Sequence, residues 1–462
     1  EAGRTRHFID FIYGINLSRA LTQSFKVSNH GKRYYNLSIG RVQGPTLAFV
    51  VDREIDIRRH VPVPYWNIHA EFEKNGQVIE SRYYQQKIRT LSDATSIVEA
   101  CRNESGKIIE IKSQKVSLKA PAPFNLGDLQ MEAYRVFKFS PSYTLTIAEK
   151  LYMSALISYP RTSSQKIPPS IDYKKIILGL SKISLSVPYN TSDKKSSEAN
   201  QNVYKNLAVS LLSETHLSPN EGSKTDPAHP AIYPTGEKPK GKLDPAELKL
   251  FDLIIKRFFA TFGKPAVSEH TTITIHVKDD HLFTADSRKT LHEGWMLYYK
   301  PYSNIIPMNS QGQLPELYMG DVLKNINIVA DEKFSQPPPR FNQATLLEQM
   351  EKDNIGTKAT RSDIISTLFK RNYIRNVNSY SSEQTNNLQT RAVSAGIEAT
   401  DIGFEIIESM RKYIPEIVSK DLTRSTEAQL QEIESGGMKS TVVLENAIEK
   451  LKRAAICFNN VA

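Results

Sequence analysis

Two blocks of strand-like sequence, separated by a long intervening segment, constrain the fold of this chain most. In residues 61–122, short runs such as Trp66–Phe72 alternate polar and apolar side chains, as in strands with one buried face. The pattern returns in residues 265–330, for example at Thr271–Val277. We therefore expect one β-rich domain that is built from both blocks and interrupted by residues 123–264.

The sequence outside these blocks predicts helices. Residues 6–21 and 44–56 and most of residues 123–264 have helical character. Thr345-x-x-Glu348 and Thr360-x-x-Asp363 resemble capping boxes that would start two helices on either side of a turn. We predict a multidomain α+β protein with helical segments at 1–60 and 331–462, the latter of helix-turn-helix character, the β-rich domain from 61–122 plus 265–330, and a helical domain from 123–264.

The composition is that of a globular, basic protein. Among 462 residues, 60 Lys and Arg face 50 Asp and Glu, and the formal charge is +10. Half of this excess lies in residues 1–60, where ten basic residues face five acidic ones. A concentrated positive charge favours a polyanionic partner such as nucleic acid, although a generally basic soluble protein is the alternative.

Cysteine usage and hydropathy restrict the possible classes further. The two cysteines, Cys101 and Cys457, form no Cys-x-x-Cys pair, which argues against a zinc ribbon or a disulfide framework in these residues. No apolar run approaches the ~18 residues of a membrane span. We therefore expect a cytoplasmic protein without a membrane partner.

The segment around Tyr159 carries the clearest chemical signal. Apolar side chains, Tyr152 among them, recur at helical spacing along Ser142–Leu156, so one face of this helix can be buried. Pro160 favours an extended Tyr159 at its end. A phenol with a pKa of about 10 needs a neighbouring cation or base to become a nucleophile, and Arg161 can supply a cation whose planar fork also matches a phosphate. This combination suits attack on a phosphodiester; a plain surface turn is the alternative.

Further segments, in a fixed order, carry a resemblance to a known family. They are Ser38–Leu47 (SIGRVQGPTL), Asn125–Gln130 (NLGDLQ), Leu156–Ser164 (LISYPRTSS), His229–Thr235 (HPAIYPT), Ile355–Arg361 (IGTKATR) and Leu422–Glu427 (LTRSTE). Together they resemble the type IA DNA topoisomerases. Their residues resemble in particular the motifs of the archaeal topoisomerase I and reverse gyrase branch. The resemblance covers nearly the whole chain, from Arg4 to about Gly437.

This resemblance implies a fold and a reaction. The fold would be a toroidal core of three domains: a helical DNA-binding domain made from residues 1–60 plus 331–462, a β-rich arch from 61–122 plus 265–330, and a helical domain from 123–264 that carries Tyr159. Tyr159 would cleave a single DNA strand through a 5′-phosphotyrosine, with Arg161 stabilising charge on the phosphate and His229 nearby. Strand passage and religation would then relax negatively supercoiled DNA without ATP. The resemblance implies DNA contacts at Arg6, His7, Asp10, Ser38, Gly40, Arg41, Gln43, Lys358, Arg361 and Arg371.

The resemblance also implies a metal that this sequence does not provide for. The family uses Mg²⁺ held by a Toprim domain with an Asp-x-Asp motif, and no Asp-x-Asp occurs in the 462 residues. We expect this chain to bind no metal and to need a Toprim domain, in cis or as a separate subunit, as a monomeric core acting mainly on single-stranded DNA. The alternatives are a non-catalytic single-stranded-DNA-binding subunit or fragment, the topoisomerase half of a split reverse gyrase, and a tyrosine nuclease or recombinase of another fold.

Overall fold

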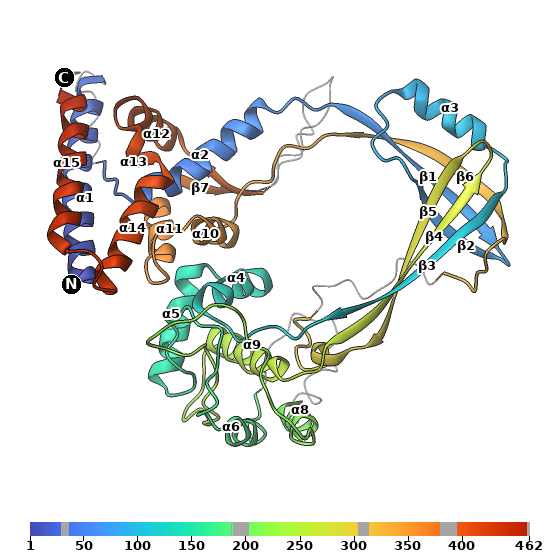
Figure 1. Cartoon of the computed structure of the whole chain (residues 1–462), viewed down its shortest axis with the longest axis horizontal. Coiled ribbons are helices and arrows are strands. Elements are labelled where there is room, and N and C mark those ends of the chain that lie inside the picture. The colour runs from blue at the N-terminus through green and yellow to red at the C-terminus, as the bar shows by residue number, and fades with distance from the viewer. Residues whose placement is uncertain (29–36, 186, 188–202, 304–313, 379–394, 460–462) are drawn as a thin grey trace. The chain divides into compact units, whose positions relative to one another are not determined.

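The computed structural model describes residues 1–28, 37–185, 187, 203–303, 314–378 and 395–459, and it divides into two compact units. Unit 1 combines Glu1–Arg59, Leu126–Ile147 and Pro338–Ala462, and unit 2 combines His60–Asn125 and Ala148–Pro337. Each unit is therefore assembled from segments far apart in the sequence, as the colour change within each part of Figure 1 shows. The predicted division into three domains stays a prediction.

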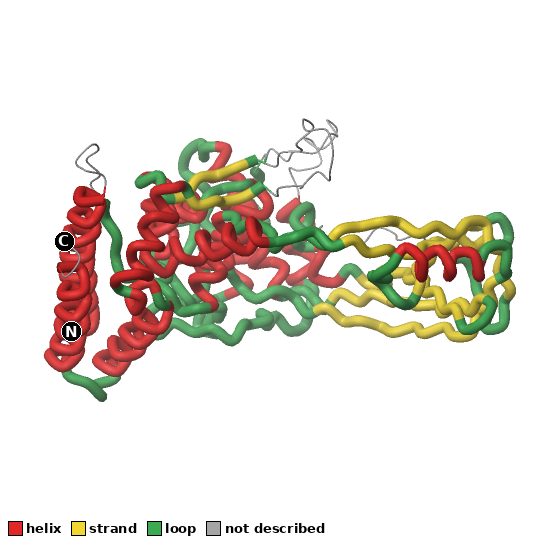
Figure 2. Tube along the Cα trace, turned by 90° about the horizontal axis from the view of Figure 1, so that it is seen from above, coloured by secondary structure: helices red, strands yellow, loops and turns green. Residues whose placement is uncertain are grey.

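The six long strands of unit 2 close into one antiparallel barrel. In spatial order they are β1 (Pro64–Lys74), β2 (Gln77–Tyr83), β5 (His281–His292), β4 (Ala266–Val277), β3 (Gly106–Leu118) and β6 (Val322–Phe334). Strands from both sequence blocks thus lie in one sheet, with β1 paired to β6 from Pro64 and Phe334 to Glu73 and Lys324. Inward side chains such as Phe72, Ile275 and Phe283 form its core, and α3 (Leu91–Cys101) lies beside β1 and β6 (Figure 2).

The helical part of unit 2 surrounds one buried helix. α9 (Pro245–Thr261) begins with a capping box between Asp244 and Glu247, and it is almost entirely buried from Leu250 onward. Inside it, the carboxylate of Asp252 pairs with Lys256 and accepts hydrogen bonds from the hydroxyls of two tyrosines. The other helices are α6 (Tyr173–Leu180), α8 (Val203–Leu212), the 3-10 helix η2 (Gly294–Leu297) and the last residues of α5 (Pro141–Met153). The ion pair and the two tyrosine hydrogen bonds compensate the buried charge of Asp252, which would be costly to bury alone.

Unit 1 is a helical unit with one hydrophobic core. Its elements are α1 (Ala2–Ser28), α2 (Gln43–Arg59), α4 (Leu126–Phe137), the start of α5, α10 (Gln343–Lys352), α11 (Arg361–Lys370), β7 (Ile374–Val377), β8 (Gly396–Ala399), α12 (Asp401–Tyr413), α13 (Pro415–Val418), α14 (Lys420–Glu434) and α15 (Ser440–Asn459). The predicted helices 6–21 and 44–56 lie within α1 and α2. Side chains from both ends of the chain, including Ile9, Leu47, Ile407 and Leu430, pack in this core.

The N-cap of α10 differs from the predicted one, whereas that of α11 agrees with it. The N-cap of α10 is Asn342, whose side-chain oxygen accepts from the backbone N–H groups of Ala344 and Thr345. The predicted N-cap, Thr345, is wrong: this residue lies inside the first turn, where its hydroxyl accepts a hydrogen bond from the N–H of Asn342 at 2.9 Å. The N-cap of α11 is Thr360, as predicted. Between the helices, Gly356 has a φ of +68°, a left-handed conformation that favours glycine.

In the portion of the chain that the structure describes, no helix is long and apolar enough to cross a bilayer.

Candidate active site and nucleic-acid interface

Tyr159 lies in an extended segment held by hydrogen bonds within unit 2. α5 ends at Met153, and Ala155 adopts a left-handed φ of 58°, which turns the chain out of the helix. Ile157 then pairs with Pro234 in an isolated bridge, and Ser158 N–H donates to the carbonyl of Tyr233 at 2.9 Å. This places the half-buried phenol of Tyr159 beside the segment that carries His229.

The three residues predicted to be catalytic are brought together. The ring centroid of His229 lies 4.6 Å from that of Tyr159, and Arg161 follows two positions after the tyrosine. The guanidinium of Arg161 donates from Nε to Oε1 of Glu149 at 2.7 Å, and both side chains are partly exposed. The phenol and the imidazole are therefore in contact, and the guanidinium lies on the same short segment as the phenol; these are groups that can serve nucleophilic attack on a phosphate.

Sequence reasoning missed two residues of this site. Tyr152 was expected in the buried face of its helix, but it is 41% exposed and its ring stands edge-on to Tyr159 with centroids 5.4 Å apart. Glu149 lies one turn earlier on α5 and engages Arg161. The spacing of three residues, which places both side chains on one helix face, is the signal that could have identified them.

In unit 1, predicted DNA-contacting residues form an ion cluster around one buried arginine. Arg41 is 2% exposed, and it donates from Nε to Asp10 and from Nη2 to Glu427, both at 3.0 Å. The second carboxylate oxygen of Glu427 accepts from Nη2 of Arg6 at 2.6 Å. Arg6, Asp10 and Arg41, each predicted as a DNA contact, therefore lie together; Glu427, from α14, was not among the predicted site residues. Two cations and two anions leave this cluster neutral.

A second group joins Ser38, Gln43 and Arg371. Arg371, at the C-terminus of α11, donates from Nη1 to the carbonyl of Ser38 at 2.8 Å and also contacts the side-chain oxygen of Gln43. Tyr373, which the sequence analysis missed, donates its hydroxyl to the carbonyl of Ser38 at 3.1 Å and accepts from its N–H at 3.0 Å. Burial raises the pKa of Tyr373, so this tyrosine remains a neutral donor.

The remaining predicted contacts are placed separately. His7 is exposed on α1, and Gly40 precedes α2, where its carbonyl accepts from the N–H of Gly44. Lys358 lies in the loop between α10 and α11. Arg361 donates from Nε to the carbonyl of Ile355 at 3.1 Å, and burial lowers the pKa of its guanidinium.

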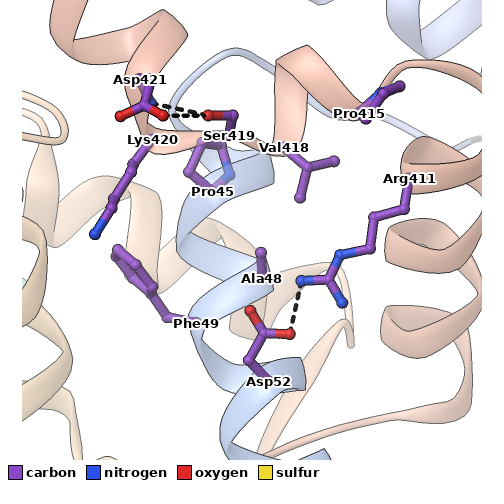
Figure 3. Close-up of a pocket in the computed structure, with 10 residues that line it drawn as sticks. All are labelled: Pro45, Ala48, Phe49, Asp52, Arg411, Pro415, Val418, Ser419, Lys420 and Asp421. Carbon is purple, nitrogen blue, oxygen red and sulfur yellow. Dashed lines mark hydrogen bonds and ion pairs between the residues drawn. The ribbon is translucent and has the colours of Figure 1, made fainter.

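Unit 1 also contains a cavity of about 440 Å³. Its lining comes from α2, α12, α13 and the start of α14: Pro45, Ala48, Phe49, Asp52, Arg411, Pro415, Val418, Ser419, Lys420 and Asp421. Figure 3 shows Arg411 and Asp52 facing each other across it, joined by an ion pair of 2.6 Å. The cavity lining includes none of the predicted site residues.

The described residues do not fit a magnesium site. Within the described ranges, the side chains form no group of three or more His, Cys, Asp or Glu that could hold a metal ion, whereas Mg²⁺ in proteins needs clustered oxygen ligands. The Mg²⁺ predicted for the complete enzyme therefore stays a prediction, and its ligands would have to come from outside these residues.

Comparison with known proteins identifies the class. A family model described as DNA topoisomerase matches residues 1–445. The chain is 40% identical over 456 residues to DNA topoisomerase 1 of Pyrococcus horikoshii, a match that covers 98% of this chain and 60% of that protein. It is 38% identical over 455 residues to DNA topoisomerase 1 of Methanocaldococcus jannaschii, covering 98% of this chain and 53% of that protein.

The fold agrees with these matches. The structure of full-length topoisomerase I from Thermotoga maritima superimposes with a TM-score of 0.74 at 25% sequence identity, over 98% of this chain and 68% of that one. The chain belongs to the type IA DNA topoisomerase family, which confirms the resemblance and the predicted mixed fold. It spans between about half and three fifths of the archaeal relatives that it matches.

Proposed function

We propose that this chain is the core of a type IA DNA topoisomerase that cleaves one DNA strand through Tyr159. The observation that carries the proposal is the cluster of Tyr159, His229 and Arg161 in unit 2. The phenol loses its proton and its oxygen attacks the scissile phosphorus, the bond from phosphorus to the 3′ oxygen breaks, and the 3′ oxygen takes up a proton. The products are a 5′-phosphotyrosine and a 3′-hydroxyl. Religation reverses this exchange. One phosphodiester replaces another, so no ATP is needed to relax negatively supercoiled DNA.

The residues of the cluster have distinct roles in this proposal. Arg161 stabilises the charge that develops on the phosphate oxygens. His229 packs against the phenol and fixes its orientation; in the imidazolium form it would also favour the phenolate. Glu149 holds Arg161 through Nε, which limits the orientations of the guanidinium before DNA binds.

The proposal also covers how the DNA strand is bound and where the Mg²⁺ ligands come from. Arg6, Ser38, Gln43 and Arg371 are partly exposed and would bind the single strand through its phosphates. Arg41 is almost fully buried between Asp10 and Glu427, so in this proposal it supports the surface from within. Carboxylates for Mg²⁺ would come from a Toprim domain, in cis or as a separate subunit. We propose a monomeric core that acts in the cytoplasm.

A relaxation assay tests this function. Supplied with a Toprim domain from a matching enzyme, the chain should relax negatively supercoiled plasmid in the absence of ATP, and Tyr159→Phe should not. Tyr143→Phe, a change of an exposed tyrosine earlier in α5, is the matched control and should retain activity. Relaxation by the Tyr159→Phe protein would rule out the proposal.

A further inference from the structure

The hydroxyl side chains that follow Tyr159 form hydrogen bonds between the tyrosine segment, residues 157–164, and the histidine segment, residues 225–235. Thr162 is fully buried, and its hydroxyl donates to the carbonyl of His229 at 3.2 Å. Ser158, on the other side of Tyr159, donates its hydroxyl to the carbonyl of Ala231 and accepts from the N–H of Tyr233, both at 3.0 Å. Segments 157–164 and 225–235 are thereby joined along their length.

Asp226 makes the strongest of these ties. Its Oδ2 accepts from both the backbone N–H and the hydroxyl of Ser163, each at 3.0 Å. Its Oδ1 accepts from the N–H of Ala228, also at 3.0 Å, which shapes the turn leading to His229. One carboxylate therefore fixes both the loop that follows Tyr159 and the turn that precedes His229. Hydrogen bonds to an ionised carboxylate are among the stronger ones in proteins.

We propose that Asp226 is a positioning residue for the Tyr159–His229 pair. Ser163 lies four residues after Tyr159, and Asp226 lies three residues before His229. The hydrogen bonds of Ser158 therefore lie before Tyr159 in the sequence, and those of Asp226 to Ser163 lie after Arg161. Together they hold the segment from Tyr159 to Arg161 at both ends. The inference rests on the proposed role of Tyr159 as the nucleophile, and it adds a residue through which that nucleophile is held.

A carboxylate suits this position because backbone N–H groups, which can only donate, face both of its oxygens: that of Ser163 faces Oδ2 and that of Ala228 faces Oδ1. In Asp226→Asn, one oxygen is replaced by an NH₂ group, which cannot accept from either Ser163 or the N–H of Ala228. The variant therefore loses at least one of these hydrogen bonds, and its NH₂ group faces another N–H donor at close range. The loop should then move, and misplacement by about 1 Å can slow a reaction on the order of a hundredfold.

The first test needs no catalysis. The full chain is labelled with ¹³C-histidine, and the His229 ring signal is assigned from its disappearance in His229→Gln. The ring current of Tyr159, whose centroid lies 4.6 Å away, should shift this signal from that of the exposed His216. Asp226→Asn should move the His229 signal toward the exposed position, and Ser163→Ala, which removes only the hydroxyl, should move it less.

The matched control is Asp172→Asn. Asp172 also accepts from a backbone N–H, that of Lys175 at 3.0 Å, but it caps α6 and has no contact with the tyrosine loop. This variant should leave the His229 signal unchanged. An unmoved His229 signal in Asp226→Asn would overturn the positioning role, as would a displacement of the same size in Asp172→Asn.

The second test uses the complete enzyme and 3′-end-labelled single-stranded DNA. Asp226→Asn should lower the rate of adduct formation roughly tenfold to a hundredfold while single-strand binding stays within twofold, since no DNA contact is removed. A wild-type adduct rate in Asp226→Asn would overturn the inference. If the wild-type enzyme forms no adduct, the proposed function fails, and the His229 signal still decides whether Asp226 positions the ring.

Discussion

The imidazole of His229 lies against the phenol of Tyr159 with ring centroids 4.6 Å apart, although 70 residues of chain separate them. This contact joins two motifs that carry little information alone. Arg161 completes the group, and its guanidinium is held by Glu149. The phenol and the imidazole are therefore in contact, and the guanidinium is held by a carboxylate, in the protein without DNA.

Arg161 and Glu149 should differ in their effect on cleavage. Arg161→Ala removes a donor that acts on the developing phosphate charge, so we expect the cleavage barrier to rise by about 3 kcal/mol with little change in strand binding. Glu149→Gln keeps a hydrogen-bond acceptor for Nε, so its effect should be tenfold or less in rate, that is about 1.4 kcal/mol. Single-turnover cleavage of labelled DNA measures both.

Lys150→Gln is the control for this pair, because Lys150 is adjacent on α5 but faces Glu247 at 3.5 Å. It should cleave at the wild-type rate. Equal losses in Arg161→Ala and Lys150→Gln would show that the general charge of α5, and not Arg161 in particular, assists cleavage.

Strand binding should depend on Arg371 and on salt. The chain should prefer single-stranded to duplex DNA, and its affinity should fall as salt concentration rises because bound phosphates release counterions. Arg371→Gln should weaken binding and reduce the salt slope by about 0.7, the value for one phosphate on a single strand. Arg375→Gln is the control, since Arg375 pairs with Glu398 on the exposed face of β7. Fluorescence anisotropy over a salt series measures the slopes.

Equal and salt-insensitive binding of both DNA forms would contradict this account of the surface. So would an identical slope for the Arg371→Gln and wild-type proteins.

Glu427 should be important for the stability of unit 1. It bridges Arg6 and Arg41, and the side chain of Arg41 is only 1% exposed. Removal of a carboxylate from a buried ion pair leaves an uncompensated charge and typically costs about 3–5 kcal/mol. Because Asp10 still pairs with Arg41, we expect Glu427→Gln to lower the free energy of unfolding by about 2–3 kcal/mol. Glu434→Gln, an exposed glutamate on the same helix, should change it little; urea denaturation followed by circular dichroism compares the two.

The residues that could be predicted lie in local sequence patterns, whereas those that were missed depend on contacts between distant parts of the chain or on how far a buried helix face extends. Tyr159 and Arg161 could be proposed from a local pattern, a phenol followed at once by a proline and a cation, and His229 was implied by the family resemblance. Glu427 lies 386 residues from Arg41, and no local pattern records which carboxylate will meet a buried guanidinium. Tyr152 looked like a core residue because helical periodicity shows that a face exists but not where that face ends.

The fold shows the same division. Alternation within Trp66–Phe72 and Thr271–Val277 predicted strands, and both runs lie in strands of the barrel. The closure of the barrel depends on pairing between distant strands, such as Arg82 with Thr284. Alternation fixes which side chains face inward but does not specify the partner strand.

Asp353 should make unit 1 sensitive to acid. This buried carboxylate, at the C-terminus of α10, accepts hydrogen bonds from Gln349 and from Lys420 of α14. Burial raises its pKa, but these hydrogen bonds and the charges of Lys420 and Arg424 outweigh that effect and hold the pKa below its ordinary value of 3.8. Because the folded pKa is lowered, the stabilisation is present above pH 3.8 and is lost as the pH falls through the folded pKa.

Asp353→Asn should therefore destabilise the chain at neutral pH by about 1–2 kcal/mol, a value reduced because Lys420 and Arg424 are partly exposed. The difference from wild type should shrink as the pH falls below 3.8. Urea midpoints for both proteins across this range give the result, and a difference that grows on acidification would contradict the assignment.

The most direct test of the account is to identify the residue that becomes attached to DNA. The chain, supplied with a Toprim domain, is trapped on 3′-end-labelled single-stranded DNA, digested with protease, and the labelled peptide is identified by mass spectrometry. We predict a 5′-phosphotyrosine at Tyr159, and no adduct from Tyr159→Phe although that protein still binds the strand. An adduct on any other residue, or one that persists in Tyr159→Phe, would contradict the central claim.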